Sequence, residues 1–174
     1  MIKKIINKIK DYKRGKEALN PMGGSVKFEG NLFAKVIRVD GTVKDLGLIS
    51  KRLVTTAFCA DMVDELITDT AGEWTAYKYH GSGTDTGAAD ISNTVLAKEV
   101  PEVRATGTQV ESGSVGYKTV GTCDYTDTHA ITEHGVFNSD SGGTLMDRHT
   151  FSAINVVDGM SIEWTYFLTV TAGG

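Results

Sequence analysis

The chain has 174 residues, long enough to bury one sizeable hydrophobic core, and this length favours a single main domain. Hydrophobic residues make up 40% and charged residues 23%, a globular composition that excludes a chain disordered throughout. No apolar run approaches the roughly 20 residues of a membrane-spanning helix. Twenty glycines against two prolines favour many tight turns between strands.

Charge is unevenly distributed along the chain. Residues 1–20 contain seven Lys and Arg and two Asp and Glu, which gives them a charge of +5. Because the net charge of the whole chain is −4, the remaining residues carry −9. The sequence therefore predicts a basic N-terminal arm on an acidic body.

Residues 2–19 are predicted to form a basic amphipathic helix. Four isoleucines at helical spacing give its apolar face: Ile2, Ile5, Ile6 and Ile9. Its other face is rich in lysine and includes Lys3, Lys4, Lys8 and Lys10. The Asn20–Pro21 step and Gly23–Gly24 end the helix, so residues 1–24 form an appendage with a linker. Because Lys and Asn interrupt the isoleucines, no secretory signal is expected, and a cytoplasmic origin is expected.

A helix of this kind fits an anionic membrane, a nucleic acid or a groove on a partner protein. It also fits packing of the isoleucines on the chain's own body or on a symmetry mate. We favour docking to a protein, because a Gly linker and an acidic body oppose a stable flat contact with membrane or DNA.

The body, residues 25–174, begins with a predicted hairpin. Leu32–Val39 and Val43–Ile49 are rich in strand formers, and Asp40–Gly41 between them is a preferred dipeptide for a two-residue turn. Thr55–Ile67 then changes to helical periodicity, with Thr55 or Thr56 as the N-cap. This is the one helix expected to pack on the body.

The rest of the body is predicted to be mainly β. Gly81–Asp90 is predicted to be an exposed loop and Ser92–Ala97 one helical turn. The predicted strands are Thr75–His80, Glu102–Val110, Gly116–Tyr125, Thr128–Phe137, Thr144–Phe151 and Met160–Thr171. In the last strand Ile162, Trp164, Tyr166, Leu168 and Val170 share one face. Strands at this spacing predict an antiparallel β-sandwich of jelly-roll-like type.

No metal or cofactor site is predicted. Gly81–Gly87 follows a strand but lacks the spacing and the helix of a phosphate-binding loop. His129 and His134 are the only closely spaced histidines, and on a strand they face opposite sides. The acidic residues of the body do not have the spacing of a calcium loop. Cys59 and Cys123 are expected to be separate thiols rather than a disulfide.

No catalytic constellation is predicted either. Glu133 is adjacent to His134, and Asp147 to Arg148, so on strands the members of each pair point to opposite faces. No nucleophile elbow is present, and no carboxylate pair favours a glycan hydrolase. A non-enzymatic protein is expected, in which Asp147 and Arg148 form a cross-strand or intersubunit ion pair.

The C-terminal half carries a run of motifs that resembles a group of tailed-bacteriophage virion proteins. The motifs are Ile131-Thr132-Glu133-His134-Gly135-Val136-Phe137, Gly142-Gly143-Thr144-Leu145-Met146-Asp147-Arg148, Phe151-Ser152-Ala153-Ile154-Asn155-Val156 and the final strand Ser161–Val170. In those proteins "ITEHG-F", a Gly-rich turn, "LLDR--F" and a long last strand recur. Residues 78–83 and 104–109 also look similar, and Met146 departs from the usual Leu.

The resemblance implies a virion component made in the host cytoplasm, with other capsid or tail proteins as partners. It is most consistent with a capsid decoration (cement) protein or head-fibre base that forms a homo-oligomer. A tail, baseplate or receptor-binding fibre module is the alternative, with the loop over residues 81–90 as its contact surface. Glu133, His134, Asp147 and Arg148 are then expected to form a structural polar cluster that fixes strand register.

Overall fold

The computed structural model describes residues 26–68 and 74–172. Phe28–Val170 form one compact unit. The predicted basic helix and its linker, residues 1–24, lie outside the described residues.

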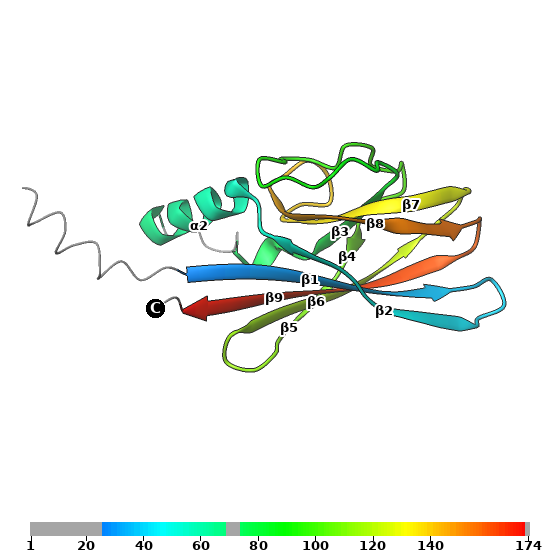
Figure 1. Cartoon of the computed structure of the whole chain (residues 1–174), viewed down its shortest axis with the longest axis horizontal. Helices are drawn as coiled ribbons and strands as arrows, with labels where there is room; N and C mark the ends of the chain where they lie inside the picture. The colour runs from blue at the N-terminus through cyan, green and yellow to red at the C-terminus, as the bar shows by residue number, and fades with distance from the viewer. Residues whose placement is uncertain (1–25, 69–73, 173–174) are drawn as a thin grey trace, which may run out of the picture. The chain divides into compact units, whose positions relative to one another are not determined.

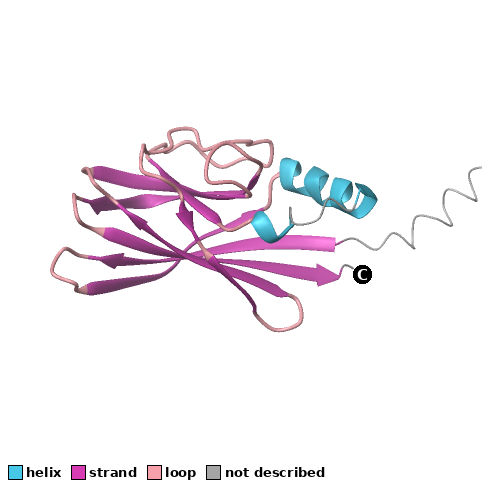
Figure 2. Ribbon diagram, turned by 180° about the vertical axis from the view of Figure 1, so that it is seen from behind, coloured by secondary structure: helices cyan, strands magenta, loops and turns pink. Residues whose placement is uncertain are grey.

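The body consists of two antiparallel sheets and one α-helix, which confirms the prediction of a mainly β fold (Figures 1 and 2). Sheet A has the order β2-β1-β9-β6-β5, and its strands are β1 (Val26–Ile37), β2 (Val43–Leu53), β5 (Thr108–Glu111), β6 (Gly116–Asp124) and β9 (Ser161–Ala172). Sheet B has the order β4-β3-β7-β8, and its strands are β3 (Tyr79–Gly83), β4 (Ala105–Thr106), β7 (His129–Phe137) and β8 (Leu145–Val156).

The two sheets contribute to one hydrophobic core. Alternate residues of β9 point into it, and Ile162, Trp164, Tyr166 and Leu168 are buried as the sequence predicts. Sheet B adds residues such as Val136 to the same cluster. Burial of these large side chains supplies the main driving force for folding.

The β1–β2 hairpin has a longer loop than predicted. Arg38 N donates to Thr42 O, so residues 39–41 form a three-residue loop. Gly41 has a φ of 80°, in the left-handed region that glycine tolerates. Three-residue hairpin loops commonly place glycine at a left-handed position. The Asp40–Gly41 pair therefore fits a three-residue loop as well as the two-residue turn that the sequence predicts.

The helix predicted over 55–67 is confirmed as α2 (Thr56–Thr68). Thr55 caps it, because its Oγ1 accepts a hydrogen bond from Phe58 N at 3.1 Å. The Phe58 ring packs edge-on against Phe28 and Tyr77, with centroids 6.0 and 5.1 Å away. These aromatic contacts attach the helix to the core.

The prediction of an exposed loop starting at Gly81 is wrong. Residues 74–76 form a short 3-10 turn, and β3 runs from Tyr79 to Gly83, with Gly81, Ser82 and Gly83 all buried. Glycine disfavours strands in general, which is why the sequence reads as a loop here. A Cβ on Gly83 would lie 2.6 Å from Lys98 O, so the glycine is required by close packing on the outer side of sheet B.

What packs there is the covering segment, defined as residues 84–104, which lies on the outer side of sheet B in both views (Figures 1 and 2). Leu96 from this segment forms a second small core with Phe137 and Leu145. The predicted helical turn at 92–97 is absent from the segment, which has turns and bends instead. Its conformation is set by contacts with the sheet rather than by local periodicity.

The strand predicted over 102–110 is divided in two. β4 belongs to sheet B and β5 to sheet A, so the chain changes sheets at Gly107. Gly107 N donates to Lys78 O at 2.7 Å, and a Cβ at this position would lie 2.8 Å from His80 Nε2. Glycine therefore lets the backbone cross between the sheets close to a buried side chain.

Replacing Gly83 with alanine tests the fit of the covering segment. The new Cβ would meet a backbone carbonyl, so we expect G83A to lower the free energy of unfolding by about 1–3 kcal/mol. Urea unfolding measures this loss, with T106A on the exposed edge strand β4 as the control. Without the clash, Gly→Ala would stabilise the protein by about 0.4–1 kcal/mol, so a gain would contradict the packing described here.

Candidate functional site

The predicted polar cluster is divided between the two faces of sheet B. Glu133 and Arg148 lie on the outer face beneath the covering segment, whereas His134 and Asp147 point into the core between the sheets. All four are buried. Neighbouring strand residues thus point to opposite faces, as the sequence analysis expected, and the four side chains form two separate sites.

The outer site is centred on Glu133, which has no exposed surface. Its carboxylate accepts hydrogen bonds from three backbone amides of the covering segment, Lys98 N at 2.7 Å, Ala97 N at 3.2 Å and Asp85 N at 3.4 Å. Arg148 Nε donates to Glu133 Oε2 at 2.8 Å. Arg148 therefore forms its ion pair across the strands with Glu133 rather than with Asp147, and the buried carboxylate fixes the covering segment to β7.

Arg148 extends this network along the covering segment. Nη2 donates to Asp85 Oδ2 at 2.8 Å, and Nη1 lies within hydrogen-bond distance of Ala88 O and Asn93 Oδ1. The backbone amide of Gly87 and, after it, Arg148 lower the pKa of Asp85. One guanidinium thus satisfies acceptors from β7 and from three points of the covering segment.

The inner site contains three fully buried histidines, one from each of three neighbouring strands: His80 on β3, His134 on β7 and His149 on β8. His80 Nδ1 lies 3.0 Å from His134 Nε2, and His80 Nε2 lies 3.2 Å from Thr119 Oγ1. The His134 ring also packs on Trp164, with centroids 4.7 Å apart. The rings are thus held by both polar and aromatic contacts.

Asp147 adds a carboxylate to the inner site. Tyr166 OH donates to Asp147 Oδ2 at 3.0 Å, and His149 Nε2 lies 3.1 Å from the same oxygen. A Cβ on Gly30 would collide with this oxygen, so a glycine on β1 makes room for the carboxylate. Among the described residues, Asp147 Oδ1, His134 Nδ1 and His149 Nδ1 have no hydrogen-bond partner, and His149 Nε2 meets Asp147 by distance but without hydrogen-bond geometry.

Burial controls the protonation of the inner site. Desolvation lowers the pKa of His80 to about 3 and that of His134 well below 6.5. It also raises the pKa of Tyr166 well above 10, and the neighbouring Asp147 acts in the same direction. The two histidines are therefore neutral at physiological pH, and they lie inside the core rather than on a cavity that a substrate could enter.

His80 and His149 also belong to this site, although the sequence does not predict them as site residues. The alternation of side chains along a strand could have indicated His149, because residues two apart share a face and His149 follows Asp147 by two positions. The position of His80 opposite β7 depends on sheet pairing between distant segments, which no local pattern contains.

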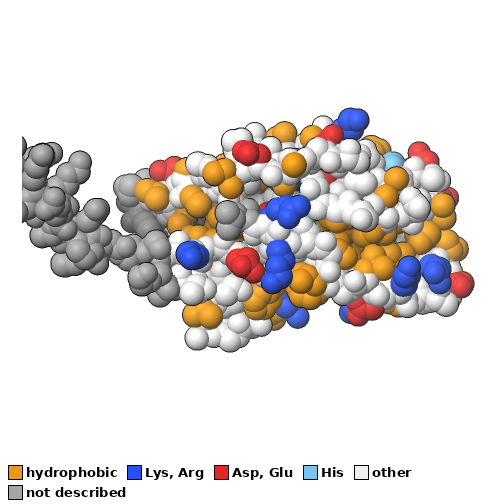
Figure 3. All heavy atoms as spheres, in the orientation of Figure 1, with side chains coloured by type: hydrophobic (Ala, Val, Ile, Leu, Met, Phe, Trp, Pro, Cys, Tyr) orange, Lys and Arg blue, Asp and Glu red, His pale blue; other side chains and the backbone are white. Residues whose placement is uncertain are grey.

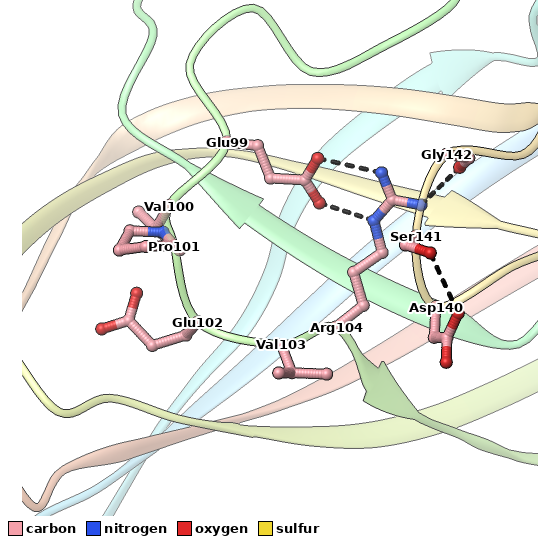
Figure 4. A pocket seen from close by; sticks show the side chains of 9 residues that line it. All are labelled: Glu99, Val100, Pro101, Glu102, Val103, Arg104, Asp140, Ser141 and Gly142. Atoms are coloured by element: carbon pink, nitrogen blue, oxygen red, sulfur yellow. Dashed lines mark hydrogen bonds and ion pairs between the residues drawn. The ribbon is translucent and has the colours of Figure 1, made fainter.

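A groove of about 440 Å³ lies between residues 99–104 and the turn at 140–142 (Figure 4). Arg104 lies in its wall and forms a two-pronged ion pair with Glu99. Its Nη1 donates to Gly142 O at 2.7 Å, and the guanidinium lies 3.4 Å from the centre of the Phe137 ring. These contacts occupy the guanidinium and give Arg104 a structural role at the groove.

The remaining predicted sites have different outcomes. The docking residues of the N-terminal helix lie outside the described residues. Within the described ranges, no group of three or more His, Cys, Asp or Glu side chains is arranged to hold a metal ion. No helix in the described part of the chain is long and apolar enough to cross a membrane. Cys59 and Cys123 are both free thiols.

No model of a known protein family matches this sequence, and no characterised protein is similar enough to count as a relative. The resemblance to virion proteins therefore stays a prediction.

Acid should destabilise the body through the inner site. The folded-state pKa values of His80 and His134 lie below the ordinary 6.5, so the unfolded chain binds more protons once the pH falls under 6.5. Stability is then highest above pH 6.5 and is lost towards pH 3. For each histidine we expect a slope approaching about 1.4 kcal/mol per pH unit.

Urea unfolding between pH 8 and pH 5 measures this slope, and an H80Q variant should reduce it by removing one titrating ring. The other ionisable groups packed around the two rings are His149, Asp147, Tyr166 and Cys123. A free energy of unfolding that does not change over this range would contradict neutral buried histidines.

Removing Arg148 should cost more than removing the whole ion pair. R148M leaves the Glu133 carboxylate buried without its charged partner, so we expect a loss of about 3–5 kcal/mol and an opened covering segment. The double variant E133Q/R148M should be more stable than R148M. Urea unfolding and limited proteolysis within residues 84–98 measure the two effects, and equal stability of both variants would argue against a buried charge.

Proposed function

We propose that the protein is a non-enzymatic structural component of a tailed-bacteriophage particle, most consistent with a capsid decoration protein or head-fibre base. One observation carries this proposal. The residues at the centre of the motifs that resemble virion proteins, Glu133, His134, Asp147 and Arg148, are all buried and make contacts within the body. Motif residues that are buried in this way stabilise the fold, and the fold in turn presents a stable surface to other proteins.

The surface and the inner site support the same proposal. The neutral histidines lie in the core, and Arg104 and Arg148 are engaged by several protein acceptors each. On the face shown in Figure 3, Lys, Arg, Asp and Glu are interspersed without one dominant charge, and hydrophobic side chains gather in the area to the right of the centre. Such a surface suits contacts with neighbouring proteins better than an extended contact with nucleic acid.

In this proposal the N-terminal segment attaches the body to the particle. Residues 1–20 carry +5 and the isoleucine face, whereas the remaining chain carries −9. An amphipathic helix can place such a face in a groove of a partner protein. We also propose that the body is a jelly-roll-like sandwich preceded by this basic helix.

The covering segment favours a second candidate, a tail, baseplate or receptor-binding fibre module. Arg148 and Glu133 hold this segment on sheet B while residues 86–88 stay exposed, so it offers a fixed surface for a receptor or glycan. The contact surface predicted over 81–90 is then reduced to residues 84–90, because Gly81–Gly83 are part of β3.

Deleting residues 1–20 tests the proposed attachment. We expect the shortened chain to keep the circular dichroism spectrum of the β body and to be missing from purified particles. A full-length variant with I5D and I6D serves as a second probe, because it keeps the length of the segment and removes its apolar face.

Normal incorporation of both variants would contradict attachment by this segment. Glycan binding by the full chain that is lost on substitution within residues 84–90 would favour the fibre module. A turnover that depends on one ionisable side chain would contradict the non-enzymatic proposal altogether.

A further inference from the structure

The outer face of sheet A differs from that of sheet B. The covering segment packs on sheet B, whereas sheet A exposes several large apolar side chains on its outer side. A groove of about 340 Å³ crosses this face and is lined by residues from β1, β2, β6 and β9.

Each strand of sheet A contributes at least one apolar residue to this face. We call these five residues the apolar stripe: Leu48 on β2, Phe33 on β1, Phe167 on β9, Val120 on β6 and Val110 on β5. Phe33 is 38%, Leu48 44% and Val110 47% exposed. The strand register fixes their common side, because Phe33 pairs with Leu48 and Lys118 pairs with both Val110 and Phe167.

Charges of opposite sign lie at different margins of the stripe. Asp45 lies towards the β2 side and Lys118 towards the β6 side, and both line the groove. Between them, Lys35 Nζ and Glu163 Oε1 form an ion pair at 2.8 Å. Lys118 has no ion pair among the described residues, so its ammonium group is available to a partner.

These charges indicate which partner fits the face. The two lysines balance the two acids, so the face is neutral and gives no net attraction to the +5 N-terminal segment. A half-turn about an axis in the plane of contact can place Asp45 of one copy opposite Lys118 of another, and the reverse. Contacts in a two-fold interface occur in such reciprocal pairs.

We propose that the outer face of sheet A is a homodimer interface, in which two apolar stripes pack together and Asp45 and Lys118 form two equivalent intermolecular ion pairs. Patches of this kind on a soluble protein commonly mark interaction sites. Dimerisation through this face is independent of whether the protein belongs to a phage particle, so its test also stands apart from that of the proposed function.

Sedimentation equilibrium of the full chain over a range of concentrations tests the interface. K118D and D45K each place like charges opposite one another in both of the two equivalent contacts. Each variant should therefore weaken the dimer by about tenfold or more. The double variant D45K/K118D reverses both charges and should recover the affinity of the parent chain to within about threefold. Asp45 also accepts a hydrogen bond from Gly47 N, so circular dichroism must accompany D45K.

F33E is a second variant that does not involve Asp45, and it should leave only monomer. V103E is its matched control, because Val103 is 81% exposed and lies on the covering segment rather than on sheet A. A parent chain that is monomeric at every concentration would overturn the proposal, as would a dimer that survives F33E. A monomeric I5D/I6D variant would also overturn it and would assign self-association to the N-terminal segment.

Discussion

The covering segment depends on one buried guanidinium. Arg148 lies on the outer face of sheet B and binds acceptors from β7 and from the covering segment, including the carboxylate of Glu133. A charge in this position is costly unless its donors are paired, and here each guanidinium nitrogen has an acceptor. The same contacts hold a segment without helices or long strands against the sheet, and they protect one face of sheet B from solvent.

Glycines complete this arrangement on both sides of sheet B. On the outer side, Gly81, Gly83 and Gly135 let the covering segment approach the strands. On the inner side, Gly121 of sheet A lies where a Cβ would be 2.6 Å from His80 Cδ2. The glycines thus complement the buried polar residues, because a position without a side chain leaves space for a bulky polar group beside it.

Strands with strict alternation could be predicted from the sequence, whereas segments held by distant contacts could not. The sequence predicts β9 correctly, because the large apolar residues Ile162, Trp164, Tyr166 and Leu168 recur at every second position, the period of a strand with one buried face. The strand predicted over 75–80 overlaps β3 only at its first two residues, because Gly81 and Gly83 lower strand propensity. These glycines are needed by the covering segment, which follows later in the chain. The division of the polar cluster between two faces follows from the alternation of side chains along a strand. The contacts of each half could not be predicted, because they depend on the pairing of strands that are far apart in sequence.

The order of sheet A has a consequence for how the chain acquires its structure. β1 is paired with β2 on one side and lies beside β9 on the other, and the Lys35–Glu163 contact across that junction spans 128 residues. Such a pairing closes a very long loop, and proteins rich in contacts of this kind fold slowly. During synthesis, the first hairpin must wait for the last strand to leave the ribosome. Until then, one edge of β1 is open to pairing with other chains, and rapid synthesis at high concentration would favour misassembly.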